Sequence, residues 1–130
     1  MSSNYEIYRC GVCGNVVEVV HGGEGALFCC GRMMTLFSER TVNVEHEPYT
    51  PHVEETARGV KVTVGVSELH AMEKDHHIQW IEVIAGPLLC RKYLKPGDKP
   101  EAEFDLENKT VIARAYCTQH GLCLEKKPIE

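Results

Sequence analysis

Four of the seven cysteines in this 130-residue chain fall within its first 30 residues. They form a Cys10-x-x-Cys13 pair and, after 15 intervening residues, the adjacent pair Cys29-Cys30. The glycines beside them permit tight turns in which backbone N–H groups point at sulfur. Four thiolates in two clusters are enough for a tetrahedral site that zinc or a single iron would occupy. A segment this short buries little core, so the metal would supply much of its folding free energy.

The adjacent cysteines favour iron over zinc at this site. Zinc ribbons normally use two Cys-x-x-Cys pairs, whereas the neighbouring Cys29 and Cys30 would impose a wider, distorted tetrahedron. A zinc staple also fits the spacing and stays open as an alternative. A disulfide framework is disfavoured, because the cysteine count is odd and disulfide-rich domains are usually secreted. The N-terminus lacks a basic segment followed by an apolar one, so no secretion signal is visible and we expect a cytoplasmic protein.

The charge and hydropathy of the chain argue against two classes of partner. The formal net charge is -5, whereas nucleic acids and anionic membrane surfaces attract basic patches. No apolar run approaches the ~18 residues that a membrane-spanning helix needs. With 43% hydrophobic and 25% charged residues, the chain has the composition of an ordinary globular protein. We therefore expect a protein that binds neither nucleic acid nor membrane.

The chain after the cysteine-rich segment is predicted to be a β domain. Residues 35–51 read as a proline-interrupted linker. Beyond it, β-branched runs with partial period-two alternation recur about every 8 to 12 residues. The predicted strands cover residues 53–56, 60–64, 78–84, 90–94, 101–106 and 110–116. In the absence of a helical period, this pattern indicates an antiparallel immunoglobulin-like sandwich over residues 38–130, following a metal-stapled domain over residues 1–37.

Ligands for a second metal site gather in two loops of this β domain. A polar loop over residues 69–77 carries His70 and His76, and the turn Cys117-x-x-His120 follows the last predicted strand. Loops between sheets are where sandwiches place function. Three imidazoles and one thiolate form a suitable ligand set for a redox-active iron. Taken singly, His46 and His52 are more often solvated or capping histidines than ligands, whereas His76 and His77 are as readily solvated as metal-bound.

Taken in order, these motifs resemble the desulfoferrodoxin family, the two-iron superoxide reductases. The resemblance rests on Cys10-x-x-Cys13, Cys29-Cys30, His70-x5-His76 and Cys117-x-x-His120-Gly121, and it covers essentially the whole chain. The connecting sequence agrees at His70-x-Met72-Glu73, Ile78-x-Trp80-Ile81-Glu82, Leu94-Lys95-Pro96-Gly97-Asp98 and Tyr116-Cys117. The common order and spacing of these motifs are far more specific than any one of them.

This resemblance implies a desulforedoxin-like domain with one iron on four cysteines, and an immunoglobulin-like domain with a mononuclear iron. The second iron would take an axial thiolate from Cys117 and equatorial imidazoles from His70, His76 and His120. The implied activity is one-electron reduction of superoxide to hydrogen peroxide without production of dioxygen. A small donor such as rubredoxin would supply electrons, which the cysteine-ligated iron would pass inward. Imidazole nitrogens suit ferrous iron, and a thiolate donates electron density to the position opposite it.

The sequence departs from the family pattern where a fourth histidine is expected. The family carries a Glu-Lys-His-x-Pro stretch before the first sandwich strand, and a gapless register places Glu47, Pro48 and Tyr49 on its Glu, Lys and His. Glu47 would then be a catalytic residue together with Cys117, while the lysine that is thought to attract superoxide is missing. The fourth equatorial position would be vacant or filled by Tyr49. The remaining alternatives, in order, are His52 and His46.

Three further expectations complete the interpretation. Cys90 and Cys123 are read as small buried hydrophobic residues, with a redox pair or an extra metal ligand as the alternative. If the histidine site is degenerate, the chain would be a non-enzymatic iron-binding electron-transfer protein. If zinc occupies the four-cysteine site, the chain would be a zinc-stabilised β domain that only binds a partner. The small metal-stapled module needs a partner surface, so we expect a homodimer.

Overall fold

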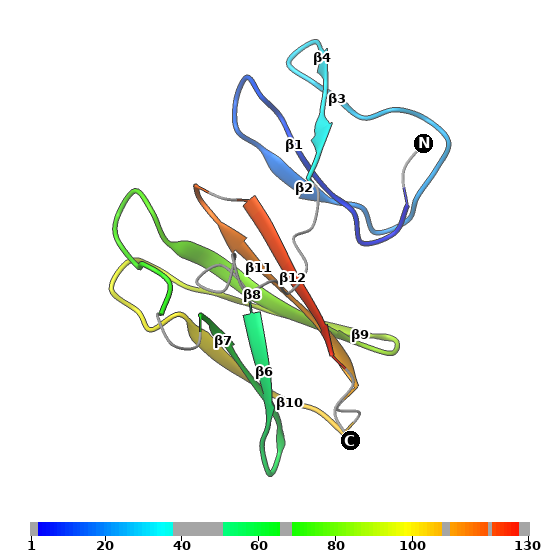
Figure 1. Ribbon diagram of the computed structural model, residues 1–130. Coiled ribbons are helices and arrows are strands. Elements are labelled where there is room, and N and C mark those ends of the chain that lie inside the picture. Colours follow the sequence, from blue (N-terminus) through cyan, green and yellow to red (C-terminus); the bar gives the residue numbers. More distant parts are fainter. Residues whose placement is uncertain (1–2, 38–50, 66–68, 108–109, 120, 128–130) are drawn as a thin grey trace. The chain divides into compact units, whose positions relative to one another are not determined.

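The computed structural model describes residues 3–37, 51–65, 69–107, 110–119 and 121–127, the last four of them without their side chains. Strands and turns make up these residues, and none of them belongs to a helix that could cross a membrane. The mainly β fold expected from the sequence is confirmed. By its contacts the chain divides into two compact units, Met1–Ser38 and Glu39–Glu130 (Figure 1).

The small unit contains two separate pieces of antiparallel sheet. Its strands are β1 (Ile7–Arg9), β2 (Val16–Glu18), β3 (Phe28–Cys29), β4 (Arg32–Met33) and β5 (Thr35–Leu36). The first sheet has the order β2-β1-β5, and β3 and β4 form a hairpin of their own. Among its described residues the buried hydrophobic side chains are Ile7, Cys10, Val19 and Met34. So small a core does not stabilise an independent domain, which is the condition under which a metal staple is needed.

The described residues of the large unit form a sandwich of seven antiparallel strands. The three-stranded sheet has the order β10-β7-β6, with β6 at Pro51–Glu55, β7 at Gly59–Val64 and β10 at Glu101–Asp105. The four-stranded sheet has the order β12-β11-β8-β9, with β8 at Ile78–Ala85, β9 at Leu88–Tyr93, β11 at Val111–Cys117 and β12 at Gly121–Lys127. Sheets of three and four antiparallel strands form the immunoglobulin-like arrangement that the sequence predicted.

Strand β12 is the strand of the sandwich that the sequence analysis missed. The run Glu125-Lys126-Lys127 has no apolar alternation, so its residues resemble a solvated tail. Gly121 has a φ of 81°, a conformation that favours glycine, and it lies at the reversal of the chain after Cys117. The returning backbone then pairs with β11 along its whole length, from Cys117 opposite Gly121 to Val111 opposite Lys127.

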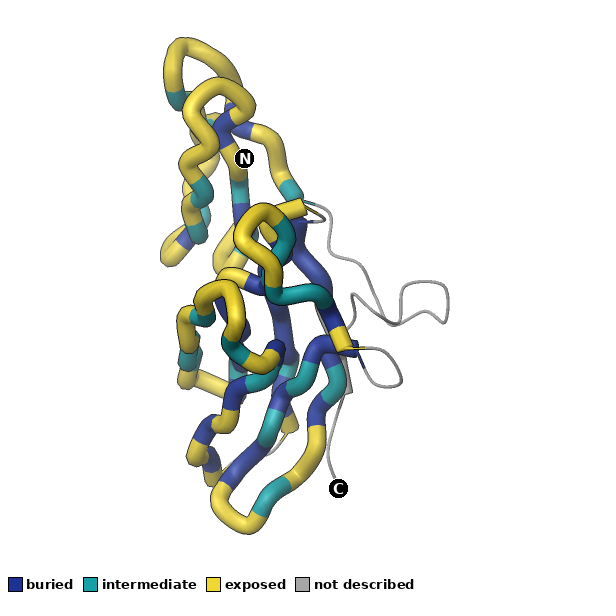
Figure 2. The backbone as a smooth tube through the Cα atoms, turned by 90° about the vertical axis from the view of Figure 1, so that its left-hand side faces the viewer, coloured by how far each residue is buried: buried dark blue, intermediate teal, exposed yellow. Residues whose placement is uncertain are grey.

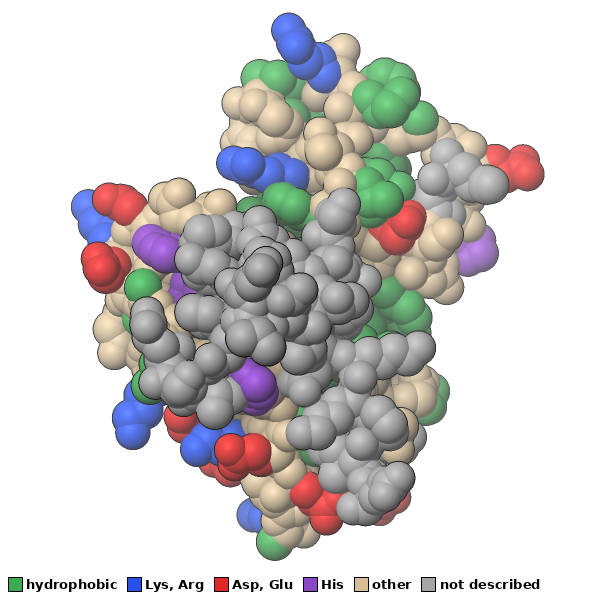
Figure 3. All heavy atoms as spheres, in the orientation of Figure 1, with side chains coloured by type: hydrophobic (Ala, Val, Ile, Leu, Met, Phe, Trp, Pro, Cys, Tyr) green, Lys and Arg blue, Asp and Glu red, His purple; other side chains and the backbone are tan. Residues whose placement is uncertain are grey.

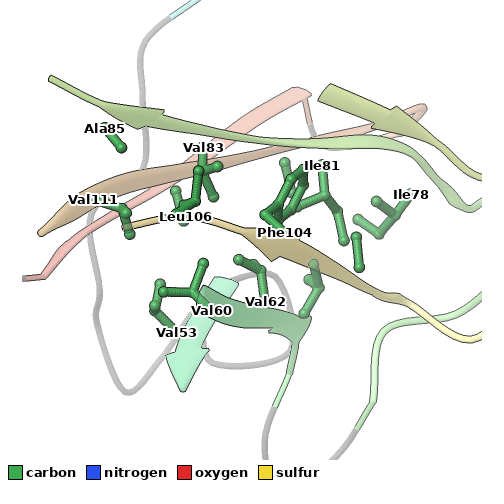
Figure 4. Packing of buried hydrophobic residues seen from close by; sticks show 14 of the residues in the cluster. Val53, Val60, Val62, Ile78, Ile81, Val83, Ala85, Phe104, Leu106 and Val111 are labelled. Atoms are coloured by element: carbon green, nitrogen blue, oxygen red, sulfur yellow. The ribbon is translucent and has the colours of Figure 1, made fainter. Parts of the chain in front are cut away.

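The hydrophobic core lies between the two sheets (Figure 4). In β7, Val60, Val62 and Val64 are fully buried and the residues between them are partly exposed, as period-two alternation requires (Figure 2). The four-stranded sheet contributes Ile78, Ile81, Val83, Ala85, Val111, Ala113, Ala115 and Cys117 to the same cluster. A Cβ on Gly59 would lie 2.0 Å from the carbonyl oxygen of Phe104, so only glycine fits this close strand pairing. Cys117, a predicted metal ligand, is therefore held by the core itself.

The other face of the four-stranded sheet carries a buried ion-pair cluster. Glu82 is fully buried and pairs with Arg114, whose side chain is only 3% exposed. The carboxylate also accepts two hydrogen bonds from Arg91, 2.9 Å from Nε and 2.6 Å from Nη2. The Arg91 guanidinium lies 5.0 Å above the ring of Trp80, which stacks on Tyr116. Removing Glu82 would take a buried carboxylate away from two arginines, of which Arg114 is itself buried.

Candidate metal centres

The four cysteines of the small unit converge on one point. Cys10 and Cys13 come from the turn after β1, Cys29 ends β3, and Cys30 follows it. Their four Sγ atoms all lie within 4.8 Å of one another, with Cys13 to Cys29 at 3.6 Å and Cys29 to Cys30 at 3.9 Å. Four sulfurs at about 2.3 Å from a central ion form a tetrahedron with edges of about 3.8 Å. The sulfur positions therefore fit one four-coordinate metal ion.

Backbone conformation explains how two adjacent cysteines share this site. Cys30 and Gly31 are the two loop residues between β3 and β4, and both have positive φ, 53° and 73°. Positive φ at both positions is typical of a type I′ hairpin turn. In this conformation Cys30 turns back toward the sulfur of Cys29 instead of pointing to the opposite face, as it would in an extended strand. A left-handed residue other than glycine costs about 1–2 kcal/mol, which the metal would offset.

Hydrogen bonds and neighbouring sulfurs give these cysteines different acidities. The backbone N–H groups of Cys13 and Val12 each donate to Cys10 Sγ over 3.4 Å and lower the pKa of Cys10 to about 6. Hydrogen bonding with Cys13, Cys29 and Cys10 raises the pKa of Cys30 to about 12. In this arrangement the hydrogen bonds favour the thiolate form of Cys10, whereas Cys30 would lose its proton to the incoming metal.

The second group of ligand atoms lies at one end of the sandwich. His70 belongs to the loop before β8, His76 to a tight turn in that loop, and Cys117 ends β11. Their ligand atoms lie within 4.8 Å of one another. The rings of His70 and His76 pack edge to face with centroids 4.9 Å apart. Both Nε2 atoms are buried, and Cys117 is fully buried, so this site is far less accessible than the cysteines of the small unit.

Backbone groups around this site orient its ligands. His70 Nδ1 lies 2.7 Å from the carbonyl oxygen of Ala71, which can only accept, so Nδ1 carries the proton and Nε2 presents its lone pair. The N–H of His70 donates to the carbonyl of Val64 in β7, which ties the loop to the sandwich. The N–H of Gln119 donates to Cys117 Sγ over 3.4 Å and stabilises a thiolate there. Sequence reasoning did not find these groups, because backbone carbonyls and amides leave no residue-type signal.

Two imidazoles and one thiolate in this geometry fit a ferrous or ferric ion, and the four sulfurs of the small unit fit the other iron of the pair. His77 is outside the cluster, and its Nδ1 lies 3.1 Å from the carbonyl oxygen of Glu73. His52 lies on β6 between the buried Pro51 and Val53, so its side chain points to the other face of that strand, and it too is outside the cluster. The predicted site residues that fall outside the described part of the chain are His46, Glu47, Tyr49 and His120.

The remaining cysteines do not form a redox pair. Cys90 lies in β9 and Cys123 in β12, the two edges of the four-stranded sheet. Three strand spacings separate them, roughly 14 Å, whereas a disulfide requires Cα atoms within about 7 Å. Neither belongs to a cluster of metal ligands among the described residues. Cys123 is buried and Cys90 packs against the core, as expected of small hydrophobic residues.

Comparisons with known proteins agree with this geometry over the whole chain. The family model of the desulfoferrodoxin N-terminal domain matches residues 2–37, and that of desulfoferrodoxin matches residues 38–126. The desulfoferrodoxin of Nitratidesulfovibrio vulgaris is 51% identical, covering 93% of this chain and 95% of its own. The superoxide reductase from Treponema pallidum has a similar fold, with a TM-score of 0.76 over 95% of this chain and 98% of its own at 23% identity. The superoxide reductase from Nanoarchaeum equitans matches 71% of this chain and all of its own, with a TM-score of 0.58 and 27% identity. The chain belongs to the desulfoferrodoxin family.

Proposed function

We propose that this protein is a superoxide reductase, which adds one electron and two protons to superoxide to give hydrogen peroxide and produces no dioxygen. The observation that carries this proposal is the convergence of Cys117, His70 and His76 within 4.8 Å from separate segments of the sandwich. Similar proteins that are named superoxide reductases share this fold. Iron bound to these ligands would supply the one-electron chemistry.

The residues of the chain prepare this site in two ways. The core keeps Cys117 fully buried, and the N–H of Gln119 stabilises its sulfur as a thiolate, so the strongest electron donor of the ligand set is shielded from solvent. Ala71 holds the ring of His70 in the tautomer that presents Nε2. On the family motifs, Cys117 would be the thiolate ligand of the iron, His120 would be a third imidazole ligand, and Glu47 would be a catalytic residue.

The small unit is proposed to accept electrons from a small acidic carrier of the rubredoxin class. Cys13 and Cys30 are exposed, so an iron at this site would approach the surface closely. The Lys and Arg residues of segment 1–37 are Arg9, next to Cys10, and Arg32, opposite Cys29 in the β3–β4 hairpin. In Figure 3 the basic side chains of this unit lie on a different side from its acidic ones. Reduction by an acidic carrier should slow with added salt, and Arg32→Glu should slow it further.

The remaining expectations concern assembly and location. Exposed apolar side chains on the small unit include Val20 at 88% and Phe28 and Met33 at 64% each, which supports a homodimer that covers them. All seven cysteines are described and none is in a disulfide, in keeping with a cytoplasmic protein. Sedimentation of the iron-loaded protein would test the dimer.

Mixing superoxide with the reduced protein tests the activity directly. Pulse radiolysis should show fast second-order oxidation of the histidine-site iron. Cys117→Ser should abolish that oxidation while the visible absorption of the four-thiolate iron is unchanged. Absence of fast oxidation in the unaltered protein would instead support a non-enzymatic iron-binding electron-transfer protein, the alternative that Tyr49 in place of a histidine favours.

A further inference from the structure

The two turns that carry His76 and Cys117 are joined to each other by hydrogen bonds. His76 belongs to a turn over residues 73–77 that is closed by a reciprocal pair of bonds, Glu73 N–H to His76 O at 2.9 Å and His76 N–H to Glu73 O at 3.1 Å. The second turn begins at Cys117, where a register shift interrupts the pairing of β11 with β8. The ladder ends just beyond that shift, at Cys117 opposite Ile78, so other groups must hold the two turns together.

Thr118 makes three of the bonds between the turns. Its N–H donates to the carbonyl of His77 over 3.1 Å, and its Oγ1 accepts the N–H of His77 over 3.2 Å. The same hydroxyl donates to the carbonyl of Asp75 over 3.4 Å. A hydroxyl can donate one bond and accept another at once, which a methyl group in its place cannot.

Gln119 adds a shorter bond from its side chain. Its Nε2 donates to the carbonyl of Asp75 over 2.7 Å, while its backbone N–H donates to Cys117 Sγ. Gln119 therefore contacts the sulfur of one ligand and the turn of another. Asp75 immediately precedes His76, so the position of its carbonyl governs where the backbone of His76 lies.

We propose that Thr118 and Gln119, the two spacer residues of the Cys-x-x-His turn, are positioning residues that fix His76 relative to Cys117. The inference rests on the proposed iron at this site. Ligands spaced by fixed turns lose less conformational entropy when the metal binds, so the brace between the turns raises metal affinity and slows metal release. Residues that orient metal ligands typically change metal affinity 10–100-fold.

The matched variants Thr118→Val and Thr118→Ser test the hydroxyl. Valine keeps the β-branched shape and the backbone N–H but removes both hydroxyl bonds, whereas serine keeps them. In the fully loaded protein, Thr118→Val should release histidine-site iron to a chelator about tenfold faster. Thr118→Ser should behave like the unaltered protein, and the visible thiolate-to-iron absorption of the site should change only with valine. Equal release from both variants and the unaltered protein would overturn the proposal.

Gln119→Met provides an independent test should Thr118→Val fold poorly. Methionine matches the length of glutamine and retains the backbone N–H to Cys117, so only the bond to Asp75 is lost. We expect iron release to accelerate about threefold, within the energy of a single hydrogen bond. Glu103→Gln, an exposed change in β10, serves as the control and should leave release unchanged. If the unaltered protein never loads iron at the histidine site, the proposed function fails; if it loads iron and Gln119→Met releases it at the same rate, the brace fails.

Discussion

The four-cysteine centre and the histidine–cysteine centre draw their ligands from very different lengths of chain. The first is complete between residues 10 and 30, on two turns of a unit whose described residues bury few apolar side chains. The second brings Cys117 to His70 and His76, from distant parts of the chain, at one end of the sandwich, and its thiolate belongs to the hydrophobic core. The first centre is exposed at Cys13 and Cys30, whereas the second is enclosed.

This difference indicates that the metal and the fold depend on each other in opposite ways in the two units. In the small unit the fold depends on the metal, whereas in the sandwich the metal site depends on the fold. In the small unit the four sulfurs join the β1 turn to the β3–β4 hairpin and the described residues bury few apolar side chains, so we expect metal binding and folding to be one event. In the sandwich the core and the strand ladders place the ligands whether or not an ion is bound. The second site therefore depends on the exact register of its strands, and its affinity depends on how firmly the turns hold the ligands.

Metal removal should separate the two units most sharply. Stripping both ions with a chelator under reducing conditions should unfold residues 3–37, because a structural four-sulfur ion supplies on the order of 10 kcal/mol. The sandwich should stay folded, since its core contains no metal. Amide chemical shifts recorded before and after chelation would show loss of dispersion in the small unit alone. Simultaneous unfolding of the sandwich would contradict the idea that its fold precedes its site.

A substitution in the ion-pair cluster of the sandwich should have the opposite effect: it should destabilise the sandwich and leave the small unit unaffected. Glu82→Gln removes the charge of a fully buried carboxylate that pairs with Arg114 and Arg91, and breaking a buried ion pair costs about 3–5 kcal/mol. Urea denaturation should show the sandwich destabilised by that amount, while the visible absorption of the four-thiolate iron persists to the same denaturant concentration. The exposed Glu103→Gln should shift stability by less than about 0.5 kcal/mol. An equal effect of both variants would mean that the ion-pair cluster does not stabilise the sheet.

The sequence predicted what residue type and spacing encode. Alternating β-branched runs marked six of the seven sandwich strands, and the cysteine pairs marked the first centre. Strand β12 was not predicted, because it pairs through the backbone of a charged segment that has no apolar alternation. The type I′ turn at Cys30 was not predicted either. The adjacent cysteines were expected to distort the tetrahedron, and a positive φ at a cysteine has no sequence signal.

For the second centre, the sequence predicted the ligands but not the groups that orient them. His70, His76 and Cys117 are the clustered residues, but the Ala71 carbonyl and the bonds of Thr118 and Gln119 depend on how the turns meet in space. The suggested redox pair of Cys90 and Cys123 was wrong, because sequence spacing does not show that their strands are opposite edges of one sheet. The assignment of Glu47 and Tyr49 rests on sequence register, since both lie outside the described residues.

The smallest expected effect concerns the sequence alignment that places Tyr49 at the position of the family's fourth histidine. If Tyr49 occupies the place of the fourth equatorial imidazole, Tyr49→His should complete the ring and lower the rate of iron release from the histidine site at least tenfold, about 1.4 kcal/mol. Tyr49→Phe distinguishes the two states of the unaltered protein. If the phenolate binds iron, phenylalanine should weaken retention and remove phenolate-to-iron absorption; if the position is vacant, phenylalanine should change neither. No gain with histidine would place the fourth ligand elsewhere, and loss of iron in His52→Ala or His46→Ala would then identify it. The gain should be confined to the second centre, because the four cysteines of the first would supply all the ligands that a tetrahedral ion takes.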